Sequence, residues 1–417
     1  MRTRVVITGL GVVSPIGIGV GQFWKNALEG HSGISAIRPF DGFPLESYRS
    51  QVAGQVLNFN PAQYLDGPHA DRVDRYAQFA LVAAKEAVAD SALRMEREDP
   101  HRVGVMVGAG MGGMVMGERE ITQLYRSHKP HRVHPNFIPT ITLNSASGIV
   151  AMAHGAKGPN LTISTACSSS AHAMGQALTA VRTGQADVVI TVGADASITP
   201  LVFAGFCSLR VLSTGFNDTP IRASRPFDRA RDGFVMGEGA GALILESLSH
   251  ARKRKARIYA EVAGYAATSE AYHMVIPRED GTEVAKTIHL ALRDAELSPA
   301  QVDYINAHAT STPIGDAVEV RALRRVFKTR ADRILVNATK SMIGHTLGAA
   351  GAIGSITCAL SLQAGQIHPT VNYEDPDPAC WLQGISTDVE ERSLKVALMN
   401  AFGFGSNNAV VVFKRYQ

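Results

Sequence analysis

The sequence contains few cysteines, and none of them stands in a metal-binding or redox pattern. Its 417 residues include Cys167, Cys207, Cys358 and Cys380. No two of these have CxxC spacing, and no Cys/His cluster has the spacing of a zinc finger. The pattern therefore predicts no metal site and favours a cytoplasmic protein with reduced thiols.

A strong excess of one charge is absent as well. The chain has 41 Lys and Arg against 37 Asp and Glu, which gives a formal net charge of +4. This balance argues against a nucleic-acid binder, although it leaves room for a local basic patch that binds an acidic partner. No run of about 18 uninterrupted apolar residues occurs, so no membrane span is expected. Residues 1–13 start like a signal peptide but lack a small-residue cleavage site, so we expect a buried strand there.

Short β-rich apolar runs alternate with alanine-rich helical stretches along the chain. Helices are expected at 77–93 and 171–182, and 45% of all residues are hydrophobic. This alternation predicts an α/β architecture with buried sheets. The apolar runs include 5–7, 103–107, 188–192, 242–245, 302–305 and 396–399.

A run of four basic residues at 252–255 lies between two stretches with a similar plan. Because charge runs are usually solvated connections, we place a domain boundary here, with one half at 1–255 and the other at 256–417. In the first half a strand leads to Cys167 and a small-residue helix. In the second half a strand leads to Lys340, His345 and another such helix. The sequence identity between the halves is too low to prove a duplication.

Cys167 lies where a polar strand end gives way to a predicted helix. The backbone N–H groups at a helix start are unpaired, and their partial positive charge lowers a cysteine pKa from about 8.5. This position predicts a thiolate nucleophile. The alternative is a buried cysteine that acts as a small hydrophobe, and we expect that role for the other three cysteines.

His308 follows a predicted strand and precedes a turn rich in Thr, Ser and Pro. Loops at strand ends often carry catalytic groups in α/β proteins, but a structural hydrogen-bonding role is an equal alternative for one histidine. Lys340 and His345 lie between another strand and a helix start, whose positive end keeps an imidazole neutral. A neutral imidazole can donate to a developing oxyanion, whereas the ordinary role of a lysine is a surface ion pair.

The segment 400–409 sets two phenylalanines, Phe402 and Phe404, among glycines. It is either a mobile loop that carries an apolar plug or a hairpin turn with two core phenylalanines. None of these motifs is decisive by itself. One cysteine and two histidines at three separate strand ends nevertheless form a pattern that is more specific than any single motif.

The motifs resemble those of the β-ketoacyl-acyl-carrier-protein synthases of the thiolase-like superfamily, specifically the elongating type II enzymes of bacterial fatty acid synthesis. The resemblance covers nearly the whole chain. It implies an α/β, thiolase-like five-layer αβαβα sandwich made from two similar halves, and a homodimer. Further matching segments are RVVITGLG at 4–11, SRPFD at 224–228, RDGFVMGEG at 231–239 and FKRY at 413–416.

The resemblance also implies a role for each candidate site residue. Cys167 matches the acylated nucleophile, and His308 and His345 match a histidine pair. Lys340 and Glu319 match a charged pair behind the histidines. We expect an acyl group on the cysteine and malonyl-acyl carrier protein as its partner in a decarboxylative Claisen condensation. No metal or redox cofactor is expected for this chemistry.

Phe402 matches the gating phenylalanine of the family, and the backbone N–H groups of Cys167 and Phe402 would form the oxyanion hole. The Cys-His-His set differs from the Cys-His-Asn set of starter condensing enzymes and from thiolases, which use a second cysteine. It also differs from chain-length factors, which lack the nucleophile. The acyl pocket is expected at Gly110, Met111 and Phe137. Basic residues for the acidic carrier protein are expected at Arg72, Lys129, Arg132 and Arg210, with scattered surface charge as the alternative.

Several positions depart from the family pattern without removing a catalytic group. Ala309 replaces a usual glycine, Ala401 replaces a common serine, and Ser406-Asn407 replaces a common Gly-Thr pair. The segment at 195–197 replaces one rich in Gly and Glu. These departures leave open a second interpretation, a ketosynthase of a polyketide or polyene pathway that pairs with a chain-length-factor-like partner in a heterodimer. A non-catalytic scaffold is disfavoured because the Cys-His-His set is intact.

Overall fold

The computed structural model describes residues 2–40, 42–65 and 72–417. One long sheet runs through the molecule in the order β12-β11-β15-β16-β10-β1-β9-β7-β5-β6. Its first half contains β1 (Val5–Ser14), β9 (Gly239–Ser247), β7 (Val188–Asp195), β5 (Val103–Gly108) and β6 (Asn160–Ile163). Its second half contains β10 (Ala260–Ser269), β16 (Asn407–Lys414), β15 (Val396–Gly403), β11 (Tyr304–Asn306) and β12 (Leu335–Asn337).

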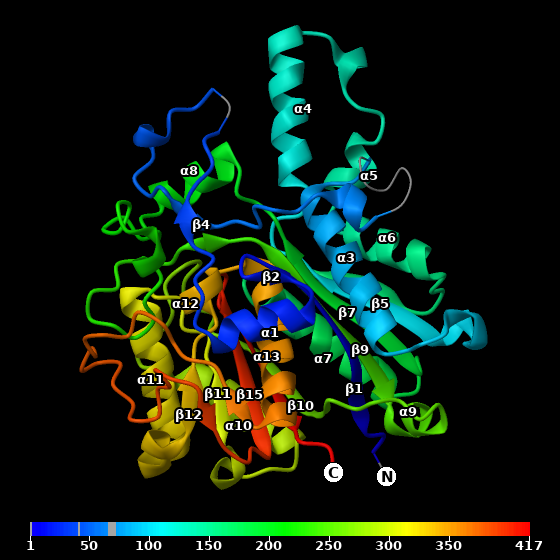
Figure 1. The fold of residues 1–417 in the computed structure, drawn as a ribbon, viewed down its shortest axis with the longest axis vertical. Helices are drawn as coiled ribbons and strands as arrows, with labels where there is room; N and C mark the ends of the chain where they lie inside the picture. Colours follow the sequence, from blue (N-terminus) through cyan, green and yellow to red (C-terminus); the bar gives the residue numbers. More distant parts are fainter. Residues whose placement is uncertain (1, 41, 66–71) are drawn as a thin grey trace.

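The two halves of the sheet are joined by a short antiparallel contact between β1 and β10, through Val6 opposite Glu261 and Ile7 opposite Ala260. Helices fill three layers around them (Figure 1). The first layer, on β1, β9, β7 and β5, contains α3 (Arg75–Asp90) and α6 (Ser145–His154). The middle layer contains α7 (Ser169–Arg182) and α13 (Ala350–Ala364), and the last contains α10 (Thr282–Asp294) and α11 (Pro313–Phe327).

Within the described residues, the order of these layers is therefore helix, sheet, helix, sheet, helix, as expected for the thiolase-like sandwich. The predicted apolar runs lie in β1, β5, β7, β9, β11 and β15, and the predicted helices are α3 and α7. Residue 255 lies between α9 (Leu248–Lys253) and β10. The division into 1–255 and 256–417 remains our proposal for the domain organisation.

Close packing of the middle layer explains the small residues in both of its helices. A Cβ on Gly193 of β7 would come within 2.4 Å of the Ser170 side chain in α7 and 2.8 Å of Ala352 in α13. The segment Leu347–Ala364, which includes α13, is the one described helix long and apolar enough to span a membrane, and 89% of it is buried in the protein. Its apolar character is therefore explained by contact with both halves of the sheet.

Shorter elements extend from these layers. α4 (Met114–Ser127) projects from the body at the top of Figure 1, and α5 (Phe137–Ile141) returns toward it. The others are α1 (Val20–Leu28), α8 (Pro200–Ser208), α12 (Lys340–Ile343), β2 (Gly17–Ile18), β3 (Ser35–Ala36), β4 (Val52–Gly54), β8 (Met236–Gly237), β13 (Gln366–Ile367) and β14 (Glu390–Glu391).

Candidate active site

The candidate residues follow the carboxyl ends of parallel strands in both halves of the sheet. β5 runs parallel to β6 and β7, and Cys167 follows β6. β11 runs parallel to β12 and β15; His308 follows β11, and Lys340 and His345 follow β12. Because parallel strands end at the same edge of a sheet, each half brings its polar loops to one place.

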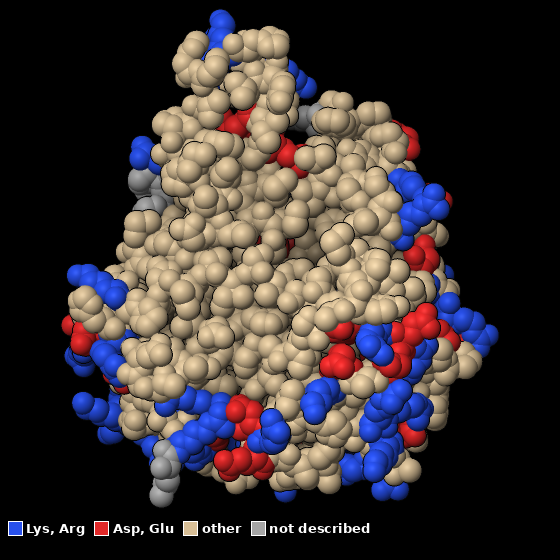
Figure 2. Space-filling view, turned by 180° about the vertical axis from the view of Figure 1, so that it is seen from behind, with Lys and Arg blue, Asp and Glu red and all other residues tan. Residues whose placement is uncertain are grey.

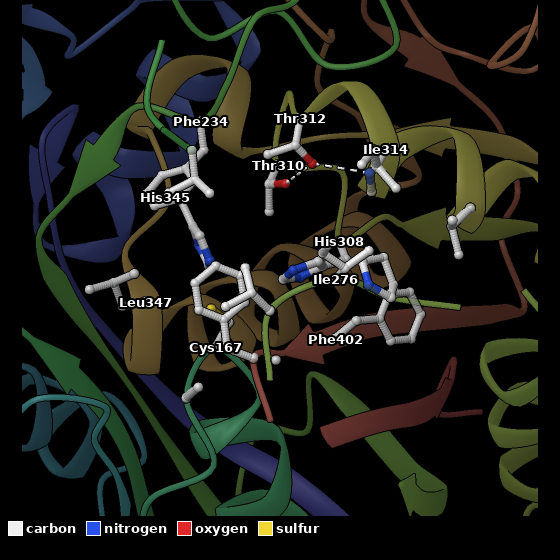
Figure 3. Close-up of a pocket in the computed structure, with 18 of the residues that line it drawn as sticks. Cys167, Phe234, Ile276, His308, Thr310, Thr312, Ile314, His345, Leu347 and Phe402 are labelled. Carbon is white, nitrogen blue, oxygen red and sulfur yellow. Dashed lines mark hydrogen bonds between the residues drawn. The ribbon is translucent and has the colours of Figure 1, made fainter. Parts of the chain in front are cut away.

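The two edges meet around a cavity of about 540 Å³. The Cys167 sulfur and the imidazoles of His308 and His345 point into this space (Figure 3). Glu319, Phe402, Gly110, Met111 and Arg210 also line it. The structure therefore brings the predicted nucleophile, the histidine pair and part of the predicted acyl pocket together.

Cys167 lies at a tight turn two residues before α7. The preceding residue, Ala166, has a φ of 52°, a conformation that alanine rarely adopts. Ser168 stabilises the turn because its hydroxyl donates to the Thr165 carbonyl at 2.8 Å. The turn leaves Cys167 6% exposed, at the wall of the cavity.

Burial raises the pKa of the Cys167 thiol to about 11, although the Lys340 ammonium and nearby backbone N–H groups act in the opposite direction. The prediction of a resting thiolate is therefore wrong. A helix start contributes only a partial charge, whereas the surrounding apolar residues remove most of the solvation of a full negative charge. At neutral pH this shift favours the thiol over the thiolate in the free protein.

His308 and His345 are both buried, and the centroids of their rings lie 5.4 Å apart. The pKa of each is lowered well below its usual value, first by burial and then by the positive charge of Lys340. The prediction of a neutral His345 is confirmed, but burial is the main cause. Nδ1 of His308 and both ring nitrogens of His345 have no hydrogen-bond partner among the described residues. Neutral imidazoles with free nitrogens can donate to a substrate oxygen.

The predicted charged pair of Lys340 and Glu319 is not in direct contact, because no distance of 4.0 Å or less joins the ammonium to the carboxylate. The Glu319 carboxylate instead accepts from the backbone N–H groups of His308 at 2.9 Å and Ala309 at 2.7 Å, and from the Asn400 amide at 2.9 Å. Glu319 thus holds the loop that carries His308. Burial lowers the pKa of Lys340 to about 8, against the opposing field of Glu319.

The predicted oxyanion-hole donors, the backbone N–H groups of Cys167 and Phe402, stay a prediction. The backbone N–H groups of Cys167 and Phe404 act to lower the pKa of the Cys167 thiol, so Phe404 is a further candidate donor. Phe402 belongs to β15 and contacts the His308 ring edge-on at 5.5 Å. Gly403 lies between Phe402 and Phe404, and its lack of a side chain lets this segment pass close to the Cys167 turn. A Cβ there would lie only 2.6 Å from the Thr165 carbonyl oxygen and 3.2 Å from the Cys167 nitrogen.

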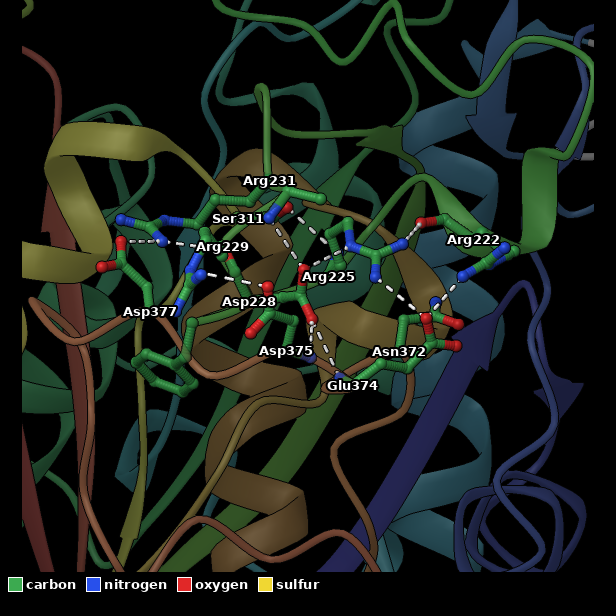
Figure 4. Close-up of polar contacts among 12 residues, drawn as sticks. Arg222, Arg225, Asp228, Arg229, Arg231, Ser311, Asn372, Glu374, Asp375 and Asp377 are labelled. Carbon is green, nitrogen blue, oxygen red and sulfur yellow. Dashed lines mark hydrogen bonds and ion pairs between the residues drawn. The ribbon is translucent and has the colours of Figure 1, made fainter.

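A buried ionic network anchors the loop that follows His308 (Figure 4). The sequence reasoning did not predict this network. Arg225 pairs with Asp228 at 2.9 Å, and the backbone N–H of Arg225 donates to the Ser311 hydroxyl at 3.0 Å. Arg231 donates to the carbonyl groups of Thr312 and Pro313 at 3.1 and 2.8 Å. The charged residues of the SRPFD and RDGF segments were visible in the sequence, but their partners at 311–313 lie about eighty residues away in the chain.

Backbone pairing fixes His345. Its N–H donates to the Val235 carbonyl at 2.7 Å, and its carbonyl accepts from the Gly237 N–H at 2.9 Å, so His345 pairs alongside β8. The sequence reasoning also missed other cavity residues, among them the hydroxyl pair Thr310 and Thr312 and the apolar Phe234 and Ile276 (Figure 3). No repeated pattern marks them in the sequence, because they come from separate loops.

The predictions for the acyl pocket and for the carrier-binding residues have mixed outcomes. Phe137 lies in α5 and does not line the cavity, so the structure does not place it in the pocket of one chain. Arg210 and Arg132 line a neighbouring groove of about 1550 Å³ between α4 and α8. Arg72 and Lys129 are exposed and line neither space. Among the described residues, no group of three or more His, Cys, Asp or Glu side chains is placed to hold a metal ion.

Comparisons with known proteins agree with this geometry. The β-ketoacyl synthase N-terminal domain matches residues 2–251, and the β-ketoacyl synthase C-terminal domain matches residues 259–374. The chain is 44% identical to 3-oxoacyl-[acyl-carrier-protein] synthase 2 of Staphylococcus aureus (strain COL), over 99% of both chains. It is 42% identical to the protein of that name from Synechocystis sp. (strain ATCC 27184 / PCC 6803 / Kazusa), over 100% of this chain and 99% of the relative.

A solved structure of a type II polyketide ketosynthase, bound to its acyl-carrier protein and a hexaketide, is also similar. It superposes on the protein with a TM-score of 0.93, at 36% sequence identity, over 100% of both chains. The fold, the pair of matched domains and the full-length relatives lead to one conclusion. The chain belongs to the β-ketoacyl synthase family.

Proposed function

We propose that the protein joins an acyl group held on Cys167 to the two-carbon unit of malonyl-acyl carrier protein, with loss of CO₂, in fatty acid elongation. The observation that carries this proposal is the single cavity shared by Cys167, His308 and His345. A nucleophile and two neutral donors in one enclosed space are the groups that a condensation between two thioesters requires.

Acyl transfer comes first. The Cys167 sulfur attacks the acyl carbon of the carrier thioester, and the carrier thiol leaves with the proton that the cysteine gives up. The backbone N–H groups of Cys167 and Phe404 are placed to stabilise the oxyanion of the tetrahedral intermediate. Lys340 assists because its positive charge stabilises sulfur as the proton is lost.

Decarboxylation and condensation follow. The bond between the malonyl carboxylate and its neighbouring carbon breaks, and CO₂ leaves. The electron pair of that bond stays on the thioester and forms an enolate. His308 and His345, both neutral, donate hydrogen bonds to the enolate oxygen. The enolate carbon then attacks the acyl-Cys167 carbonyl, and the sulfur leaves, which gives a 3-oxoacyl carrier two carbons longer.

The test is incubation with malonyl carrier and a panel of acyl carriers, with intact-protein mass spectrometry to locate the acyl group. We expect a single acyl adduct on Cys167 and none in Cys167→Ala, which retains its fold. Cys207→Ala is the matched control, because Cys207 is buried but lines the neighbouring groove rather than the cavity. Normal chain extension by Cys167→Ala would refute the mechanism.

A second function is a ketosynthase of a polyketide or polyene pathway. The similarity to a polyketide ketosynthase over the whole chain favours it. The reaction on Cys167 is the same, but repeated extension without reduction would give poly-oxo products. Product analysis after several malonyl additions, with and without a co-expressed Cys-less partner chain, separates the two functions.

An acidic acyl carrier protein is the proposed partner, and the groove between α4 and α8 supports it. Arg210 lines both the groove and the cavity, and Arg119, Arg126 and Arg132 line the groove beside it. The carboxylate of Glu118, in the same groove, is already bonded to Thr199 and the start of α8. We expect Arg210→Glu to raise the KM for acyl carrier and to weaken the dependence of KM on salt, with kcat little changed.

A homodimer in the cytoplasm completes the proposal. The edge strand β6 pairs with β5 on one side only, and Leu161 in it is 48% exposed. Figure 2 shows a broad central area almost free of charged side chains, with Lys, Arg, Asp and Glu gathered mainly below it. Depletion of charge is typical of interface cores. Light scattering should give twice the mass of one chain for the wild type. Leu161→Lys should shift the measured mass toward that of a single chain.

A further inference from the structure

Asp195 is a fully buried carboxylate at the last position of β7, and the proposed reaction does not use it. β7 runs parallel to β5, with Gly193 opposite Gly108. Asp195 lies two residues after Gly193, and Gly110 lies two residues after Gly108. The parallel register therefore brings Asp195 beside Gly110. Gly110 and Met111 line the cavity on the side where we expect the acyl chain.

The Asp195 carboxylate holds two separate cavity loops at once. Its Oδ2 accepts from the backbone N–H groups of Gly110 and of Gly348, each at 2.9 Å. Its Oδ1 accepts from the Met111 N–H at 3.3 Å and from the Ser197 hydroxyl at 3.0 Å. Gly348 follows Leu347, which lines the cavity, and lies three residues after His345 (Figure 3).

The two loops approach too closely for side chains at the contact. A Cβ on Gly110 would lie 2.6 Å from Asp195 Oδ2, and a Cβ on Gly348 would lie 2.4 Å from the Gly110 nitrogen. The Asp195 carboxylate is bonded to both backbones and so links the wall that carries Met111 to the wall that carries His345. Four hydrogen bonds offset part of the cost of burying this carboxylate, and burial still raises the pKa of Asp195 above its usual value.

We propose that Asp195 is a positioning residue that fixes the Gly110–Met111 loop to the Leu347–Gly348 loop and thereby determines which acyl lengths fit beside Cys167. This role rests on the proposed acyl transfer. If the link is released, Met111 and Leu347 are free to move apart or into the cavity, and the fit of the acyl chain changes. An error of about 1 Å in such positions is enough to change rates by about a hundredfold.

The charge of Asp195 gives a second, independent readout. Its field raises the pKa of the Cys167 thiol, and this effect does not depend on any substrate. Removing the charge without changing the size of the side chain therefore makes Cys167 react at lower pH. A residue with a merely structural role would not move this pH profile in a folded protein.

The experiment compares Asp195→Asn, Asp195→Glu and the control Ser197→Ala, which removes one hydrogen bond to the same carboxylate and touches neither loop. Two measurements are made on each folded variant: the iodoacetamide alkylation rate of Cys167 against pH, and the rates of Cys167 acylation by short-chain and long-chain acyl carriers. For Asp195→Asn we expect alkylation to move to lower pH and the long-to-short rate ratio to change by about tenfold or more. For Ser197→Ala we expect both to stay near wild type.

Asp195→Glu keeps the charge but lengthens the link by one methylene, so the acylation ratio should change while the alkylation profile stays. This variant carries the test if Asp195→Asn does not fold. An acylation ratio equal to wild type in a folded variant would overturn the proposal. If no variant, wild type included, accepts acyl groups while the alkylation shift is present, acyl transfer fails but the electrostatic coupling of Asp195 to Cys167 stands.

Discussion

The ring of His308 stands edge-on to the ring of His345, with an angle of 87° between their planes. Phe402 contacts His308 from one side, and Phe234 contacts His345 from the other at 5.4 Å. The two imidazoles are therefore held in fixed orientations by aromatic neighbours rather than by hydrogen bonds. Their free nitrogens remain available to one substrate oxygen.

His308→Ala and His345→Ala should each slow the release of CO₂ from malonyl carrier by about a hundredfold or more, because each removes a donor to the enolate oxygen. Acylation of Cys167 is the internal control and should continue in both variants. Release of CO₂ is measured with labelled malonyl carrier. Unchanged release in both variants would remove the histidines from the mechanism.

The reactivity of Cys167 should depend on the charge of Lys340. Lys340→Met keeps the length of the side chain but removes the charge, so the alkylation profile of Cys167 should move to higher pH than in the wild type. The wild-type profile should also change slope near pH 8, where Lys340 loses its proton. Peptide mass spectrometry confirms that Cys167 is the alkylated residue. Identical profiles for both proteins would contradict this coupling.

Gly403→Ala adds only one methyl group but should strongly slow the acylation of Cys167. The new methyl group would meet the Thr165 carbonyl at 2.6 Å and push the Phe404 N–H away from the sulfur. We expect acylation to slow by about a hundredfold, the effect of losing one oxyanion-hole donor. Gly205→Ala is the matched control, because a Cβ there meets nothing within 4 Å and should leave acylation intact. Equal rates in the two variants would argue against the donor role of Phe404.

Ala309, which replaces a usual glycine of the family, has a φ of 22°. An L-residue with a side chain is strained in such a conformation, whereas glycine is not. Ala309→Gly should therefore raise the free energy of unfolding by about 1 kcal/mol, measured by urea denaturation. Ala307→Gly, two residues earlier without a positive φ, should lower it. Destabilisation by both substitutions would show that the loop carries no strain at Ala309.

His250 should make the stability of the protein depend on pH. Its Nδ1 lies 2.7 Å from Glu246 and its Nε2 lies 2.9 Å from Glu98, and these carboxylates raise its pKa above 6.5. A group whose pKa is raised by folding stabilises the native state fully below its unfolded value. This stabilisation is lost as the pH rises through the folded pKa.

The free energy of unfolding should therefore fall between pH 6.5 and the folded pKa of His250 in the wild type. His250→Gln removes the titrating group and should flatten this part of the profile. Urea denaturation at several pH values measures both proteins. A profile of the same slope in the variant would exclude His250 as the cause.

The sequence by itself determined the class of fold and indicated the candidate reacting groups. Alternating apolar runs and alanine-rich segments give strands and helices, and Cys167, His308 and His345 each follow a strand. These features are local, because they depend on periodicity and on the residues at element ends. The motifs around them were sufficient to indicate the β-ketoacyl synthase family.

Only the tertiary structure decided the electrostatics and the partners of those groups. Burial raises the pKa of the Cys167 thiol, Lys340 and Glu319 form no direct ion pair, and Phe404 joins Phe402 as a candidate donor. The tertiary structure also placed Asp195 against two loops that no sequence spacing connects. The physical reason is that desolvation and hydrogen bonding in a buried site are set by segments far apart in the chain, and their approach is fixed only when both halves of the sheet pack together.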